Sequence, residues 1–152
     1  MNESLRAADV ELEIDIKATK DKVWNAFVHD IAQWWPKQAF MTQARKICFE
    51  PHVGGRVFED KGDGTGGIWW HVHAIETGDY VVLLGHIWPG QGGPATSIAK
   101  LTLEDRHGHT VLKIHDSMFG RLTDERIGSI KHGWEGLFAK GLKPYIETRT
   151  TR

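Results

Sequence analysis

The sequence predicts an α+β domain in which one antiparallel sheet is covered by a long C-terminal helix. Apolar and polar residues alternate in about six to seven segments between Val10 and Phe119, with the period of strands that bury one face. Turns rich in glycine separate most of these segments, which favours a meander of neighbouring strands. After Thr123 the period changes to that of a helix. Because this helix is the only element large enough to cover the apolar face of the sheet, we expect the two to share one core.

The first strand and the first helix follow the N-terminal residues. The segment "VELEIDIKA" (10–18) alternates apolar and acidic side chains, as a strand does when one of its faces meets water. Thr19 or Asp21 is placed to cap a helix over "KDKVWNAFVH" (20–29), in which apolar residues recur at helical spacing. We expect a second short helix between this one and Pro36.

The remaining strands and the long helix complete the predicted order. The strands are predicted over residues 44–50, 55–60, 68–76, 79–88, 96–104 and 110–119. From Thr123 to about Thr148, the apolar residues fall on or near one stripe of a helix. Pro144 predicts a kink or an end of that helix near residue 143.

The composition indicates one globular domain over residues 1–152, with loose ends at 1–8 and 149–152. A formal net charge of −1 gives no basic field that would attract nucleic acid or an acidic membrane. No apolar run is long enough to span a bilayer. The single cysteine, Cys48, and the lack of a secretory signal favour a cytoplasmic location. The glycine-rich loops lack the lysine of a phosphate-binding loop, and the common hydrolase and zinc motifs are absent, so no cofactor is expected.

The hairpin around residues 105–108 predicts one set of inward-facing side chains. Pairing Leu103 with Thr110 sets apolar residues opposite one another and places Ser97 opposite Asp116. The inward-facing residues would be Leu101, Leu112, Ile114, Asp116 and Met118. The alternative is that Asp116 lies at the strand end in solvent.

The hairpin over residues 68–88 carries aromatic and histidine side chains on both faces, so two orientations are open. The first turns inward Trp69, His71, His73, Ile75, Val81, Leu83, Gly85 and Ile87. The second turns inward Trp70, Val72, Ala74, His86 and Trp88. We prefer the first, because it sets Gly85 opposite His71 and gives the imidazole room.

Two histidines and one aspartate are the candidate catalytic groups. His71 and His73 lie on one side of a strand, about 7 Å apart along it. Together with Asp116 they have the ligand types of a two-histidine, one-carboxylate metal site. Exposed or hydrogen-bonded histidines are the alternative, and no metal is assigned. A histidine in a partly apolar pocket would instead transfer protons, because burial changes its pKa.

Seven tryptophans in 152 residues exceed what the core of such a domain ordinarily requires. Trp34 and Trp35 are neighbours, so one element cannot bury both rings against one surface. We expect one ring under the long helix and the other at a cavity mouth or at the surface, although core filling is the alternative for each tryptophan. The candidate ligand-binding residues are Trp34, Trp35, Phe40, Trp69, His71, His73, Leu83, Ser97, Leu101, Leu112, Ile114, Asp116, Met118, Trp134 and Phe138.

Four segments together resemble a known family. They are "QWWP", "CFEPHVGGRVFED" (48–60), "GHTVLKIHDSMFG" (108–120) and "HGWEGLFAKGLKPYIE" (132–147). In this order, over nearly the whole chain, they are similar to the AHSA family, named for the C-terminal domain of the activator of heat-shock-protein-90 ATPase. That family belongs to the START/Bet v 1-like helix-grip superfamily (SRPBCC). The resemblance implies a seven-stranded curved sheet that grips the C-terminal helix around a ligand cavity.

Two departures from the family pattern bear on function. We expect no separate chaperone-binding domain like that of the eukaryotic co-chaperones, and Asp116 stands where the family often has histidine. We favour binding of a small, mostly apolar or aromatic molecule. The alternatives are a polyketide cyclase/dehydratase-like enzyme that uses His71, His73 or Asp116, and a chaperone-activating interaction domain. A homodimer is a further alternative, because an exposed Trp70 or Trp88 would form an apolar patch at which two copies could associate.

Overall fold

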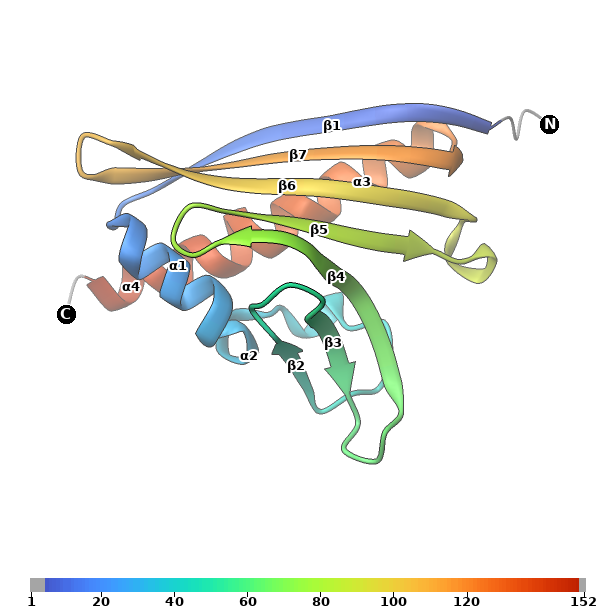
Figure 1. The fold of residues 1–152 in the computed structure, drawn as a ribbon, viewed down its shortest axis with the longest axis horizontal. Coiled ribbons are helices and arrows are strands. Elements are labelled where there is room, and N and C mark those ends of the chain that lie inside the picture. Colours follow the sequence, from blue (N-terminus) through green and yellow to red (C-terminus); the bar gives the residue numbers. More distant parts are fainter. Residues whose placement is uncertain (1–4, 151–152) are drawn as a thin grey trace.

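The computed structural model describes residues 5–150, which form one antiparallel sheet of seven strands and the helices that pack on it (Figure 1). The strands are β1 (Leu5–Ile16), β2 (Lys46–Phe49), β3 (Arg56–Asp60), β4 (Gly66–Glu76), β5 (Tyr80–Ile87), β6 (Ala95–Arg106) and β7 (His109–Arg121). The strand order is β1-β7-β6-β5-β4-β3-β2, a meander closed by the first strand beside the last. The predicted α+β helix-grip fold is confirmed.

The helices lie before the meander and after it. They are α1 (Lys20–His29), α2 (Ile31–Trp34), α3 (Asp124–Leu137) and α4 (Lys143–Thr150), with short 3-10 turns at Lys37–Ala39 and Pro89–Gln91. Thr19 caps α1 by accepting from the backbone of Lys22, and Thr123 caps α3 in the same way. None of the described helices is long and apolar enough to cross a membrane.

The C-terminal helix continues past Pro144. A wide π turn at Phe138–Leu142 joins α3 to α4, and the backbone N–H of Lys143 reaches the carbonyl of Phe138. The wider turn makes room for the proline ring, which would clash with the preceding turn of a regular helix. Phe138, Leu142 and Ile146 are buried against the sheet. The helix therefore packs along the core over both of its halves.

Strand β4 carries two β-bulges, each of which bends a strand and interrupts its alternation of faces. The first lies on the β3 side. There Val57 pairs with Trp70 and Phe58 pairs with Ile68, so Trp69 is the additional residue. Trp69 and Trp70 consequently lie on the same side, with ring centroids 5.5 Å apart. Figure 1 shows this part of β4 bending away from β5 while it runs beside β3.

The second bulge overturns the preferred orientation of the β4 histidines. On the β5 side the register shifts just after Val72, so His73 is the additional residue. Val72 and Trp70 face the core, whereas His71 and His73 are exposed. The inward placement of both histidines is wrong, because strict alternation from Ile75 does not anticipate a bulge.

The β6–β7 hairpin keeps the predicted face in a different register. Leu103 pairs with Leu112, two residues beyond the predicted partner, because a two-residue turn closes the hairpin. A shift of two residues leaves each side chain on its face. Asp116 therefore points inward and is 1% exposed, although it pairs with Ala99 rather than with Ser97. Its alternative placement in solvent is wrong.

The ends of the described chain belong to regular elements. Residues 5–8 pair with β7, and residues 149–150 belong to α4. The loose ends expected at 1–8 and 149–152 are not found in these described parts, and residues 1–4 and 151–152 lie outside them.

Candidate functional site

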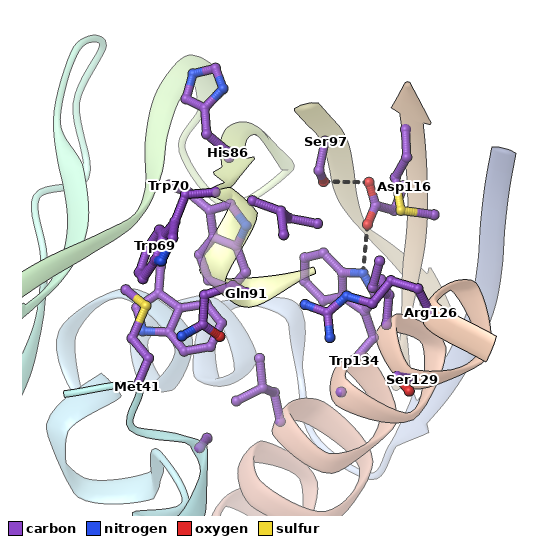
Figure 2. Close-up of a pocket in the computed structure, with 18 of the residues that line it drawn as sticks. Met41, Trp69, Trp70, His86, Gln91, Ser97, Asp116, Arg126, Ser129 and Trp134 are labelled. Atoms are coloured by element: carbon purple, nitrogen blue, oxygen red, sulfur yellow. Dashed lines mark hydrogen bonds between the residues drawn. The ribbon is translucent and has the colours of Figure 1, made fainter. Parts of the chain in front are cut away.

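A pocket of about 300 Å³ lies between α3 and the strands β4 to β7 (Figure 2). One face of α3 forms its floor, because residues spaced by three and four along a helix point the same way. These helix residues are Arg126, Ser129, Ile130, Gly133, Trp134 and Leu137. The facing strands contribute Ser97 from β6, Asp116 and Met118 from β7, and the tryptophans of β4. The mouth is bordered by Trp88 and Gln91 in the β5–β6 connection.

Two stacked indoles form the main apolar wall. Trp70 and Trp134 lie with ring centroids 5.3 Å apart and planes 10° apart. Gly85 makes this arrangement fit, because a Cβ there would lie 2.8 Å from Cδ1 of Trp70. The room that glycine leaves on β5 is thus taken by Trp70, and not by His71 as predicted.

The neighbouring tryptophans of the "QWWP" segment support this wall from behind. The chain leaves α2 at Trp35, which is extended, so the two rings are tilted by 46° with centroids 6.0 Å apart, and both are buried at 5% exposure. Trp34 donates from Nε1 to the carbonyl of Ala26 at 2.8 Å and packs against Phe138. Trp35 packs edge-on against Trp69, 5.3 Å between centroids. The expectation that one ring lies at a mouth or at the surface is wrong.

Asp116 is the buried acid of the pocket. Ser97 Oγ donates to its Oδ1 at 2.5 Å, and Trp134 Nε1 donates to its Oδ2 at 2.9 Å (Figure 2). Burial raises the pKa of the Asp116 carboxyl, while the two hydrogen bonds act in the opposite direction. The site therefore holds a carboxyl group that keeps its proton to a higher pH than an exposed aspartate does.

A second buried carboxylate, Glu59 on β3, fixes another part of the wall. It accepts hydrogen bonds from Trp69 Nε1 at 2.7 Å, from the backbone of Met41 at 2.7 Å, and from the backbone and hydroxyl of Thr42 at 2.7 and 2.6 Å. Met41 and Trp69 both line the pocket. Sequence reasoning missed Glu59. Its position two residues after Val57 was the available signal, because residues two apart on a strand share one face.

The comparisons with known proteins agree with this architecture. The model of a family described as "Activator of Hsp90 ATPase homolog 1-like protein" matches residues 17–147. The chain belongs to this family. No curated protein matches the chain significantly in sequence.

Solved structures with the same fold come from several sources. Protein MLL2253 of Mesorhizobium loti is 26% identical, with a TM-score of 0.66 over 94% of this chain and 98% of that one. Ara h 8.0201 is 19% identical, with a TM-score of 0.69 over 94% and 99% of the two chains. A protein of Rhizobium leguminosarum is 18% identical, with a TM-score of 0.70 over 95% and 97%. These likenesses place this family member in the Bet v 1-like fold.

The pocket collects only part of the predicted site. Of the candidate ligand-binding residues, those that line it are Trp69, Ser97, Asp116, Met118 and Trp134. Those in the packed core beside it are Trp34, Trp35, Leu83, Leu101, Leu112, Ile114 and Phe138, and Phe40 is half-buried against that core. His71 and His73 lie on the outer face of the sheet, away from Asp116, so the three do not form one site. Trp70 is 7% exposed and offers no dimer patch, whereas Trp88 is 47% exposed.

Sequence reasoning missed several lining residues of the pocket. They include Gln91, Arg126, Ile130 and Gly133, whereas the first orientation of residues 68–88 turns Gly85 inward and the second turns Trp70 inward. Helical spacing would have found the three on α3, because Arg126 and Ile130 lie eight and four residues before Trp134, and Gly133 lies four residues before Leu137. The bulge at Trp69, which brings Trp70 inward together with its neighbour, leaves no periodic signal.

Proposed function

We propose that the chain binds a small, mostly apolar or aromatic molecule in the pocket between α3 and the sheet. The stacked pair of Trp70 and Trp134 carries this proposal, because two rings held in place by packing present a rigid apolar surface. The pocket volume of about 300 Å³ falls at the lower end of the range for small-molecule sites. Asp116 adds a polar group at the same wall, as such sites commonly do.

Filling the pocket from the helix side tests the proposal. Gly133 lines the pocket, and a Cβ at this position would meet nothing within 4 Å. Gly133→Leu therefore places a side chain in the pocket without a backbone clash. Gly128 has the same open surroundings on α3 but does not line the pocket, so Gly128→Leu is the matched control. Both changes favour the helix, because leucine is a better helix former than glycine.

Isothermal titration calorimetry with 2-naphthamide, a neutral aromatic probe, reads the outcome. Wild type and Gly128→Leu are expected to bind the probe, and Gly133→Leu is expected to lose binding while keeping its circular dichroism spectrum. Native mass spectrometry of the three freshly purified proteins looks for a small molecule that follows the same pattern. Undiminished binding by Gly133→Leu, or no binding by wild type, contradicts the proposal.

Proton transfer to a bound substrate is the second candidate function. It is favoured by the Asp116 carboxyl, which lies in the pocket with a pKa raised by burial. His71 and His73 take no part in this version. Asp116→Asn should abolish cyclisation or dehydration of a polyketide-like chain while leaving its binding intact. Absence of any product with wild type would leave the binding function alone.

A further inference from the structure

The pocket mouth carries a cationic side chain, Arg126, for which the described part of the chain offers no counter-charge. Arg126 extends from the first turn of α3 into the pocket (Figure 2). Its Nε is buried and donates no hydrogen bond to any residue in the range 5–150. Within the same range, no aspartate or glutamate forms an ion pair with its guanidinium. Because arginine stays charged, this is a cation with an unused donor at an apolar site.

The nearest candidates for a counter-charge are engaged elsewhere. Asp124, two positions earlier in α3, pairs with Arg6 at 3.0 Å. Asp116, in the same pocket, accepts from Ser97 and Trp134. Residues 5–150 therefore supply no anion for Arg126.

The position of Arg126 is unfavourable for a cation in two further respects. The first turn of a helix is the positive end of its dipole, which favours acidic groups and disfavours basic ones. A buried donor without an acceptor also opposes folding. Even so, the fold leaves room for the guanidinium. Residue 92 is a glycine with a φ of +94°, and a Cβ there would lie only 3.0 Å from the Nε of Arg126. A bound anion beside the guanidinium would balance its charge and interact favourably with the helix dipole.

We infer that the ligand of this pocket carries a carboxylate, and that Arg126 binds it at the mouth while the apolar body lies against Trp70 and Trp134. This inference rests on the proposed binding function and specifies its ligand class. The planar guanidinium matches a carboxylate with two parallel hydrogen bonds. Gln91 and Ser129 line the same pocket and offer further polar groups to the anion. The ligand is accordingly an amphiphilic aromatic or apolar acid.

A matched pair of probes tests the inference. 2-Naphthoate and 2-naphthamide share one ring system and differ in the charge of the group attached to it. Wild type should bind the carboxylate about tenfold more tightly, as expected for one added charge-assisted contact. Arg126→Gln should lose this preference and keep its affinity for the amide. Arg126→Lys should retain part of the preference, because it keeps the charge without the planar fork.

Lys131→Gln is the matched control, because it removes the same charge from an exposed position of α3 outside the pocket. It should keep the full preference, which should weaken with added salt in both wild type and control. Equal binding of the two probes by wild type, or an unchanged preference in Arg126→Gln, overturns the inference while the proposed function stands. If neither probe binds wild type, the proposed function fails and the inference fails with it.

Discussion

Replacing Glu59 by alanine tests whether one buried carboxylate holds a wall of the pocket in place. Its side chain is 1% exposed and accepts four hydrogen bonds of 2.6 to 2.7 Å. A hydrogen bond to a charged group contributes about 1.5–3 kcal/mol. Because Met41 and Thr42 are half-buried, water can bond to their donors in the variant and recover part of the lost free energy. We expect Glu59→Ala to lower the free energy of unfolding by about 3–5 kcal/mol, roughly two such bonds in full.

Glu59→Gln removes the negative charge of the side chain and keeps its shape, so it separates the two contributions to stability. Its carbonyl oxygen still accepts from Trp69 and from one loop amide, so the expected loss is only about 1–2 kcal/mol. Glu13→Ala, which removes an exposed partner of Lys113, should change stability by less than about 0.5 kcal/mol. Urea unfolding followed by circular dichroism measures all three, provided that the m-value is unchanged. A loss below about 1 kcal/mol for Glu59→Ala, or equal losses for the two Glu59 variants, would refute this reasoning.

Two further predictions concern the pocket wall. Burial raises the pKa of Asp116, so between the unfolded and folded pKa the native state binds more protons and its stability falls as pH rises. Asp116→Asn should remove this fall, so the variant should gain stability relative to wild type between pH 4 and pH 7, by about 1.4 kcal/mol for each unit of pKa shift. Urea unfolding midpoints measured at pH 4 and pH 7 test this, and the same change with pH in wild type and variant would contradict it. Gly85→Ala sets a Cβ 2.8 Å from Trp70 and should lower the free energy of unfolding by about 1–3 kcal/mol. Gly136→Ala, whose Cβ has open surroundings, should raise it by about 0.5–1 kcal/mol. Thermal unfolding measures both, and changes of the same sign in the two variants would disprove the crowding argument.

The fold could be predicted because its signals are local and periodic. Residues 20–29 form α1 as predicted, since their apolar spacing and the cap at Thr19 agree. The predicted β6–β7 register was wrong by two residues, but the assignment of side chains to the inner and outer faces was unaffected, because side chains alternate with a period of two. The placement of Asp116 inside the molecule therefore followed from the sequence.

The rest of the site depends on departures from periodicity and on contacts between distant segments. The bulges at Trp69 and His73 reverse the faces of β4, and no spacing in the sequence marks them. The spacing from Val57 places Glu59 on the inner face, but its hydrogen-bond donors come from other segments, among them the loop at Met41 and Thr42. The Arg126 Nε finds no acceptor within residues 5–150, and this is likewise a property of the assembled structure, since a sequence does not show which acids are already engaged.

The face-to-face contact of Trp70 with Trp134 also provides the molecule with its own optical reporter. Both indoles border the pocket, so an incoming guest changes the polarity around a coupled pair of chromophores. Near-ultraviolet emission should therefore report occupancy without any attached dye. Trp70→Phe and Trp134→Phe, made one at a time, would identify the share of this signal that comes from the pair among the seven tryptophans of the chain.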